Sequence, residues 1–261
     1  MNASAGGRRG PRRAWLALVL LACTVAATIA LGRWQLHRAQ EKRDLMAAVE
    51  AGRSRPPLAL DAGANPAALV PWRPAVAHGR WLADRTILLD NRSAAGRPGF
   101  WVVTPLLLAG TPSRGTAVAV LRGWLPRAFP DAPQNAIPAP GGELDVRGEL
   151  LDHVPRLFEL PSWLGGRAAQ LPSRLPDPSG IVPRVQNLDL GVYSGATGLA
   201  LLPAVLQQTG EAADGLLRDW PPPPSNVDTH LGYAMQWFSF AAIAAIAFGV
   251  ILVRRFRPTR P

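Results

Sequence analysis

The fold class of this chain is decided by two uncharged apolar runs, AWLALVLLACTVAATIAL at residues 14–31 and AMQWFSFAAIAAIAFGVILV at residues 234–253. A helix needs about 20 apolar residues to cross the hydrocarbon core of a bilayer, and both runs approach or reach that length. The alternative for the first run is a cleaved signal peptide, but the run is longer than the usual apolar core of one. The two runs therefore predict a protein with two transmembrane helices.

The positive charge of the chain is concentrated beside these two runs. Lys and Arg total 28 against 18 Asp and Glu, which gives a net charge of +10, and eight of the arginines lie outside the runs in tails that have no acidic residue. Those arginines are Arg8, Arg9, Arg12, Arg13, Arg254, Arg255, Arg257 and Arg260. A nucleic-acid-binding protein gathers such charge on a folded face, so we expect no nucleic-acid partner.

Positive charge that flanks a membrane span stays in the cytoplasm, so both termini are predicted to be cytoplasmic and the central domain extracytoplasmic. In a bacterial cell this describes a multi-pass protein of the inner membrane. The predicted organisation is a basic tail (residues 1–13), a first span (14–31), the extracytoplasmic domain (32–230), a second span (231–253) and a second basic tail (254–261).

Small residues recur every four positions in both spans: Ala22, Ala26 and Ala30 in the first, and Ala241, Ala245 and Gly249 in the second. Such spacing lets two helix backbones approach closely. The alternative is that alanine is simply abundant in these runs, and the sequence does not separate the two interpretations.

The sequence predicts that the first helix continues past the membrane to residue 50. It predicts a mainly antiparallel β domain after that helix. Short apolar or alternating runs separated by turn signals are typical of such strands. The expected strands are residues 75–81, 86–91, 101–108, 117–124 and 144–151, with turns at residues 83–85, 97–99, 112–115 and 140–142. Residues 188–197 are expected to form a short helix, and residues 199–207 a last strand that Pro203 places at an edge of the sheet.

Gly123 is singled out within this domain because it follows a strand-like run and precedes Trp124. A glycine in that setting marks a bulge or a close backbone contact, and a side chain there should lower the amount of folded protein. The alternative is an ordinary turn glycine.

Motifs for catalysis are absent from the sequence. The four histidines form no zinc-binding spacing, and no nucleophile elbow or glycine-rich phosphate loop occurs. The single cysteine, Cys23, rules out a disulfide within the chain and a two-cysteine metal site. We therefore expect that the protein is not an enzyme, and the alternative of a membrane-tethered hydrolase is disfavoured.

His230 stands where the chain enters the second span. On a helix it shares one face with Tyr233, Ala234, Trp237 and Ala241. An imidazole at the hydrocarbon boundary needs a partner, and imidazole is a usual axial ligand of haem iron, so His230 is a candidate functional residue. The alternative is a polar helix start that faces lipid head groups, with Tyr233 and Trp237 as interfacial anchors.

Seven stretches, in order along the chain, resemble those of the surfeit locus protein 1 family, membrane proteins that assist the assembly of haem-copper cytochrome c oxidase. They are GRWQL at residues 32–36 with Arg38 and Lys42, GRW at 79–81, LDNR at 89–92, RPGFWVVTPL at 97–106, VLRGWLP at 120–126, VRGEL at 146–150 and HLGYAMQWF at 230–238. Two departures stand out. Many members have asparagine where this chain has Thr229, and residues 153–180 have no family feature that aligns.

The resemblance implies an assembly factor that assists delivery of haem a to oxidase subunit I, with other assembly factors and the lipid bilayer as further partners. His230 occupies the family position associated with haem a, as axial ligand of the iron, and Tyr233 and Trp237 would shape its pocket. Arg38 or Arg122 would pair with the propionates, and His37 is a candidate second ligand that the family motif does not require. The rival function is a scaffold that holds an oxidase subunit without binding haem.

Overall fold

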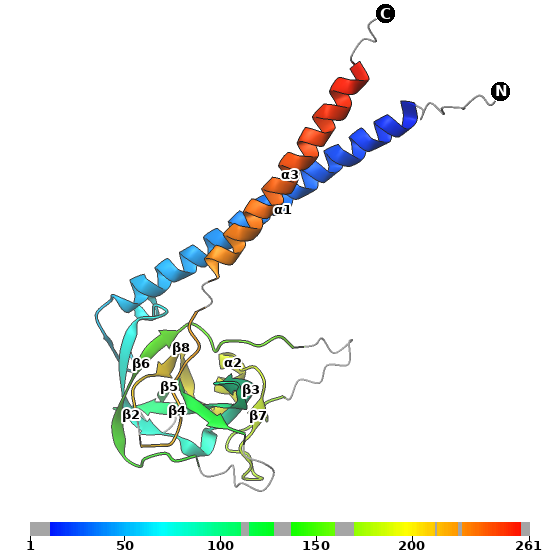
Figure 1. The fold of residues 1–261 in the computed structure, drawn as a ribbon. Helices are drawn as coiled ribbons and strands as arrows, with labels where there is room; N and C mark the ends of the chain where they lie inside the picture. Colours follow the sequence, from blue (N-terminus) through cyan, green and yellow to red (C-terminus); the bar gives the residue numbers. More distant parts are fainter. Residues whose placement is uncertain are drawn as a thin grey trace, which may run out of the picture. The chain divides into compact units, whose positions relative to one another are not determined.

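The computed structural model describes residues 11–110, 115–127, 137–159, 170–211, 213–223 and 226–256 (Figure 1). The chain divides into two units, a helical unit (residues 1–47 and 223–261) and a β domain (residues 48–222). Arg8, Arg9, Arg257, Arg260 and the expected turn at residues 112–115 lie wholly or largely outside the described residues.

The two apolar runs form the long helices α1 (Pro11–Arg53) and α3 (Val227–Phe256). Both helices are long and apolar enough to cross a membrane. Proline at the start of α1 suits the first helical position, where its missing N–H costs nothing. The expected extension of the first helix beyond residue 31 is confirmed, and the helix continues three residues past Glu50.

Less exposed positions recur in both helices at alternating spacings of four and three, which is the period by which helices pack along a seam. In α1 they include Leu18, Leu21, Val25, Thr28, Gly32, Gln35 and Ala39, and in α3 His230, Ala234, Trp237, Ala241, Ala244 and Phe248. The helices touch at Gly32, where a Cβ would lie 2.7 Å from the Phe238 ring. Ala22, Ala26 and Ala30 are exposed, so of the two interpretations that the sequence left open for α1 the structure favours simple abundance of alanine, and the packing face of α1 is a different one.

The β domain is built around a closed barrel of five strands. Around the barrel the strands pair in the order β2–β6–β8–β5–β4, and β4 pairs again with β2. Their bounds are β2 (Pro74–Trp81), β4 (Arg97–Leu108), β5 (Thr116–Pro126), β6 (Glu143–Leu151) and β8 (Ala200–Gln208). Outside the barrel, β1 (Leu58–Leu60) pairs with β2, β3 (Ile87–Ala94) with β4, and β7 (Arg184–Val185) with β3.

The remaining elements are helix α2 (Leu190–Thr197) and the short 3-10 helices η1 (Pro66–Ala68) and η2 (Ala83–Arg85). The Asp189 side chain caps α2 by accepting hydrogen bonds from the N–H groups of Gly191 and Val192. The expected helix at residues 188–197 is therefore confirmed, two residues shorter at its start.

Strand β5 separates two apolar cores, because side chains alternate between the faces of a strand. Val118 and Val120 pack in the core that Trp81 and Leu206 line, whereas Ala119 and Leu121 pack on the opposite side with Tyr193. Burial on both faces explains why β5 reads as a continuous apolar run in the sequence.

The predicted place of β8 at a sheet edge is wrong. β8 lies between β5, to which it is parallel, and β6, to which it is antiparallel. Pro203 falls where the register with β5 shifts: Ala117 pairs with Leu201, but Ala119 pairs with Val205. Proline is tolerated at such a bulge because no ladder hydrogen bond is required of its nitrogen.

Another correction concerns the stretch RPG at residues 97–99, for which the sequence predicts a turn. These residues begin β4, and the turn is made by Ala95 and Gly96, which both have positive φ angles. A two-residue turn of this kind matches the twist of a hairpin, so β4 starts four residues earlier than the sequence indicates.

Gly123 lies at a bulge, as predicted. Val102 pairs with Gly123 and Val103 with Leu121, so Arg122 is the extra residue. The bulge lets Leu121 and Trp124 face the same core. A Cβ on Gly123 would lie 2.7 Å from Leu216 Cβ and 2.9 Å from the Leu217 carbonyl oxygen, so glycine is required there by close approach.

We expect Gly123→Ala to lower the free energy of unfolding by about 1–3 kcal/mol, as overpacking of a filled site does. Denaturant unfolding of the purified chain measures this change. Gly141→Ala is the matched control, because nothing lies within 4 Å of a Cβ at Gly141. Equal stability of the two variants would contradict the close-approach argument.

His78 joins β2 to β6 through charged side chains. It stands opposite Asp145 in the register, with His78 Nδ1 2.7 Å from the Asp145 carboxylate and Nε2 3.4 Å from that of Glu143. The hydrogen bond to Asp145 is the largest of the effects that raise the pKa of His78 above 6.5. A raised folded-state pKa means that the protonated ring stabilises the fold.

That stabilisation should be complete below the ordinary histidine pKa and lost as pH rises through the raised value. We therefore expect His78→Gln to lower the free energy of unfolding at about pH 5.5 and to have little effect at about pH 8.5. Unfolding curves at the two pH values measure the difference. Asp145→Asn should remove the same pH dependence, and an effect of His78→Gln that is equal at both values would contradict this assignment.

Candidate functional site

His230 lies in the first turn of α3 and faces α1. Its Nδ1 is 2.7 Å from Oε1 of Gln35, and the side chain is half-buried. Gln35 is 9% exposed and belongs to the GRWQL stretch. Because an amide oxygen only accepts hydrogen bonds, the imidazole Nδ1–H is the donor. Nε2 of His230 has no protein partner among the residues that the structure describes.

Tyr233 and Trp237, the other predicted site residues, lie one and two turns along α3 from His230. Tyr233 is 50% exposed, and Trp237 is half-buried with its ring edge-on to Phe240 at 6.0 Å. Ala234, between them, is fully buried. The expected helix face thus divides: Ala234 and Ala241 are buried, His230 and Trp237 are half-buried, and Tyr233 is exposed.

His37 and Arg38 share Glu41 as a partner on α1. His37 Nε2 is 3.3 Å and Arg38 Nη1 is 2.7 Å from the Glu41 carboxylate, and the His37 side chain is 74% exposed. His37 is two residues from Gln35, which places the two side chains on different faces of the helix. The structure therefore does not bring His37 to the imidazole of His230.

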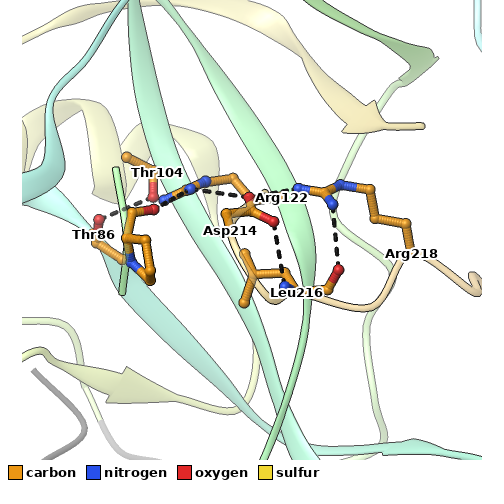
Figure 2. Close-up of polar contacts among 7 residues, drawn as sticks. Thr86, Thr104, Arg122, Asp214, Leu216 and Arg218 are labelled. Carbon is orange, nitrogen blue, oxygen red and sulfur yellow. Dashed lines mark hydrogen bonds and ion pairs between the residues drawn. The ribbon is translucent and has the colours of Figure 1, made fainter. Parts of the chain in front are cut away.

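A buried polar cluster lies in the β domain, around the bulge of β5 (Figure 2). The Asp214 carboxylate accepts hydrogen bonds from Arg122 at 3.1 Å and from Arg218 at 2.6 Å, and its second oxygen accepts one from the Leu216 N–H. Arg122 also donates to the Pro138 carbonyl and stacks 4.7 Å from the Trp81 ring centroid. This buried polar cluster fixes the segment at residues 213–218 against β5.

Two buried guanidinium groups share one carboxylate in this cluster, so part of their charge is uncompensated. Burial lowers the pKa of Arg122, and within the described part of the chain Nε and Nη1 of Arg122 and Nε of Arg218 have no hydrogen-bond partner. Arg92 is buried in a similar way 4.3 Å from the Trp101 ring centroid, and burial lowers its pKa to about 10.

Arg122 does not fit the expectation that it pairs with haem propionates. Its side chain is 1% exposed and already paired with Asp214, so it is not presented to a ligand at the surface. Arg38, the other candidate, is half-exposed and paired with Glu41. The sequence favoured Arg122 because arginine matches carboxylates well, and the structure gives it an internal carboxylate instead.

Metal-binding groups of three or more His, Cys, Asp or Glu side chains are absent from the described part of the chain. His78 and His153 each pair with carboxylates: His78 with Asp145, and His153 with Asp152 at 2.7 Å. His230 is thus set apart from the other three histidines, whose rings have acidic partners, by its neutral amide partner.

Gln35 and Asp214 each make a central contact in one of these two clusters, and the sequence assigned no role to either residue. Gln35 could be placed on the packing face of α1 only by the alternating four- and three-residue period, which becomes clear once the buried positions are known. Asp214 lies in an irregular segment that pairs with β5 through a bridge between Trp124 and Leu217, and no local pattern in the sequence signals such a pairing.

Fold and site together define a class: proteins in which two helices of membrane-spanning length flank a β-barrel domain and hold a histidine at the start of the second helix. Comparison with known proteins identifies the family within this class. The model of the SURF1 family matches residues 22–242. The chain therefore belongs to the SURF1 (surfeit locus protein 1) family, and the match includes both Gln35 and His230.

The similarity to individual relatives extends over nearly the whole chain. A SURF1-like protein of Monosiga brevicollis is 28% identical, with 97% of this chain and 92% of the relative aligned. Uncharacterised SURF1-like proteins of Mycobacterium bovis and Mycobacterium tuberculosis are each 27% identical, over 95% of this chain and 87% of the relative.

We expect Asp214→Asn to lower the free energy of unfolding by about 3–5 kcal/mol, because it leaves two buried guanidinium groups without a counter-charge. Arg156→Gln is the comparison, since it removes an ion pair with Asp189 whose two side chains are more than half exposed. Such a surface pair contributes about 0–1 kcal/mol. Denaturant unfolding of both variants measures the contrast, and similar losses of stability would contradict a structural role for the buried pair.

Proposed function

We propose that this protein is an assembly factor for haem-copper cytochrome c oxidase that holds haem a on His230 during its delivery to subunit I. The observation that carries the proposal is the imidazole of His230, bound through Nδ1 to Gln35 and without a protein partner at Nε2 among the described residues. Membership of the SURF1 family supports the same function. In this proposal the chain binds its cargo and catalyses no reaction.

The residues at the site would suit a bound haem, with the imidazole of His230 as the iron ligand. A neutral imidazole nitrogen is a usual ligand of haem iron, and aromatic side chains such as Tyr233 and Trp237 suit the flat face of a porphyrin. His37 is paired with Glu41 and does not join the site, so the proposal assigns a single ligand from this chain. A single ligand is appropriate for cargo that must later be released.

The proposal places α1 and α3 across the cell membrane, with both termini in the cytoplasm and the β domain outside. Exposed apolar side chains support a membrane-spanning position of the two helices: Leu16, Val19 and Leu20 of α1 and Ile243, Ile246 and Val253 of α3 are all more than half exposed. Apolar residues exposed over such lengths match a lipid environment. Other oxidase assembly factors and subunit I would then meet the chain in or at the membrane.

This topology predicts opposite behaviour for two reporter fusions. A reporter fused after Pro261 should be active only as a cytoplasmic reporter, because Arg254 and Arg255 hold that end inside. A reporter inserted between Ala62 and Gly63, in the turn after β1, should behave as extracytoplasmic. A cytoplasmic signal from the insertion would contradict the orientation, and with it the side of the membrane on which His230 lies.

A second candidate function is a scaffold that holds an oxidase subunit without binding haem. The observation that favours it is the hydrogen bond between His230 and Gln35, because this bond also gives the imidazole a purely structural partner between the two helices. In the scaffold function His230 would help to hold α3 against α1, and its loss would lower stability rather than haem content.

His230→Ala separates the two functions. We expect the variant to be produced and inserted as the native chain is, and to lose the absorbance of bound haem a, because the iron ligand is gone. The absorbance spectrum of the purified protein and its amount in the membrane give the two readings. His37→Ala is the matched control and should keep the haem, and the double variant should resemble His230→Ala.

Native haem binding by His230→Ala would overturn the carrier function. If the variant instead loses stability and the native chain carries no haem when purified together with subunit I, the scaffold function takes its place.

A further inference from the structure

Gln35 is the side chain that contacts the imidazole of His230. The two residues come from different helices, 195 positions apart in the chain, and their polar atoms are 2.7 Å apart. Gln35 is 9% exposed on the packing face of α1, with Gly32 and Ala39, both buried, one turn away on either side. Because Gly32 and Ala39 are small, they leave room for the Gln35 amide to reach the ring of His230.

The chemistry of this contact fixes which ring nitrogen carries the proton. The amide oxygen Oε1 has no proton to give, so it can bind Nδ1 only when Nδ1 is protonated. In a neutral imidazole the other nitrogen, Nε2, then has a free electron pair. A histidine that binds a metal is usually held in this way, by a hydrogen bond from its other ring nitrogen to an oxygen.

We propose that Gln35 is a positioning residue for haem a: it holds His230 in the tautomer protonated at Nδ1 and directs the electron pair of Nε2 away from α1. This inference rests on the proposed function, because it assigns to Gln35 an effect on the iron ligand. It also goes beyond that function, because it makes the affinity of His230 for the iron depend on the contact between α1 and α3.

Burial supports the assignment. Water competes poorly for a ring nitrogen that a side chain 9% exposed already covers, so loss of the amide oxygen leaves Nδ1 without an equivalent acceptor. The ring is then free to rotate or to move its proton to Nε2, and a protonated Nε2 cannot bind iron. Removal of such a supporting group from a metal ligand typically costs about 10–100-fold in metal affinity.

The first experiment reads the tautomer without haem. The full chain, labelled with 15N-histidine and reconstituted in lipid nanodiscs, is studied by NMR at an alkaline pH of about 9, and His230→Ala assigns the signals of that ring. We expect ring shifts of a neutral imidazole protonated at Nδ1, and in Gln35→Leu a shift of the proton toward Nε2. A native ring protonated at Nε2, with the amide group as donor, would overturn the proposal.

The second experiment reads haem a affinity by titration of the same variants. Gln35→Leu should bind haem a about 10–100-fold more weakly than the native chain. Gln35→Glu keeps an acceptor oxygen, so it should retain the tautomer and most of the affinity and lower the midpoint potential of the bound haem, because a carboxylate makes the imidazole a stronger donor. Gln40→Leu is the matched control, since Gln40 is an exposed glutamine of α1 whose side chain donates a hydrogen bond to Asp44.

The outcomes separate this inference from the proposed function. Affinity of Gln35→Leu equal to that of Gln40→Leu would overturn the positioning role, even if His230 is required for haem. If the native chain binds no haem a, the proposed function fails and the positioning role for haem fails with it, whereas the NMR result still decides whether Gln35 sets the tautomer. Restored affinity in Gln35→Glu, beside its loss in Gln35→Leu, would support the role of the acceptor oxygen.

Discussion

A hydrogen bond between Gln35 of α1 and His230 of α3 is the contact on which the candidate site depends. Polar side chains between two apolar helices are costly unless they bind each other, so this pair favours one rotation and one register of the two helices. Gly32 contributes to the same register, because only a residue without a Cβ lets the Phe238 ring approach so closely. The position of the imidazole is therefore a property of the helix pair, and neither helix alone determines it.

The β domain depends on a comparable constraint, at the bulge of β5. The extra residue there, Arg122, is buried with its charge, and the glycine that follows it leaves room for the segment that carries Leu216 and Leu217. Asp214 of that segment supplies the counter-charge. The short motif RGW at residues 122–124 is thus explained by packing, since the arginine forms the ion pair, the glycine permits the close approach and the tryptophan fills the core.

Local patterns in the sequence were sufficient for most of the fold. Both long helices, α2 and the barrel strands were placed to within a few residues, because apolar runs and turn residues act locally. The errors arose where partners distant in the sequence decide the outcome. Pro203 lies in a central strand because β8 shifts its register with β5. The sequence left open whether the regularly spaced alanines of α1 form a packing face, and their exposure in the structure answers that question. The candidate site divides in the same way: His230, Tyr233 and Trp237 could be nominated from the sequence as candidates, whereas the contact made by Gln35 depends on the rotation of two helices.

The most direct measurement of the central claim is pulsed electron-nuclear double resonance on the ferric haem a complex of the chain labelled with 15N-histidine. Coupling to the iron from the nitrogen of one imidazole is the result that we predict. Coupling from two imidazoles would show that a second histidine also binds the iron. The absence of imidazole coupling in a complex that still contains haem a would contradict the assignment of His230 as the ligand.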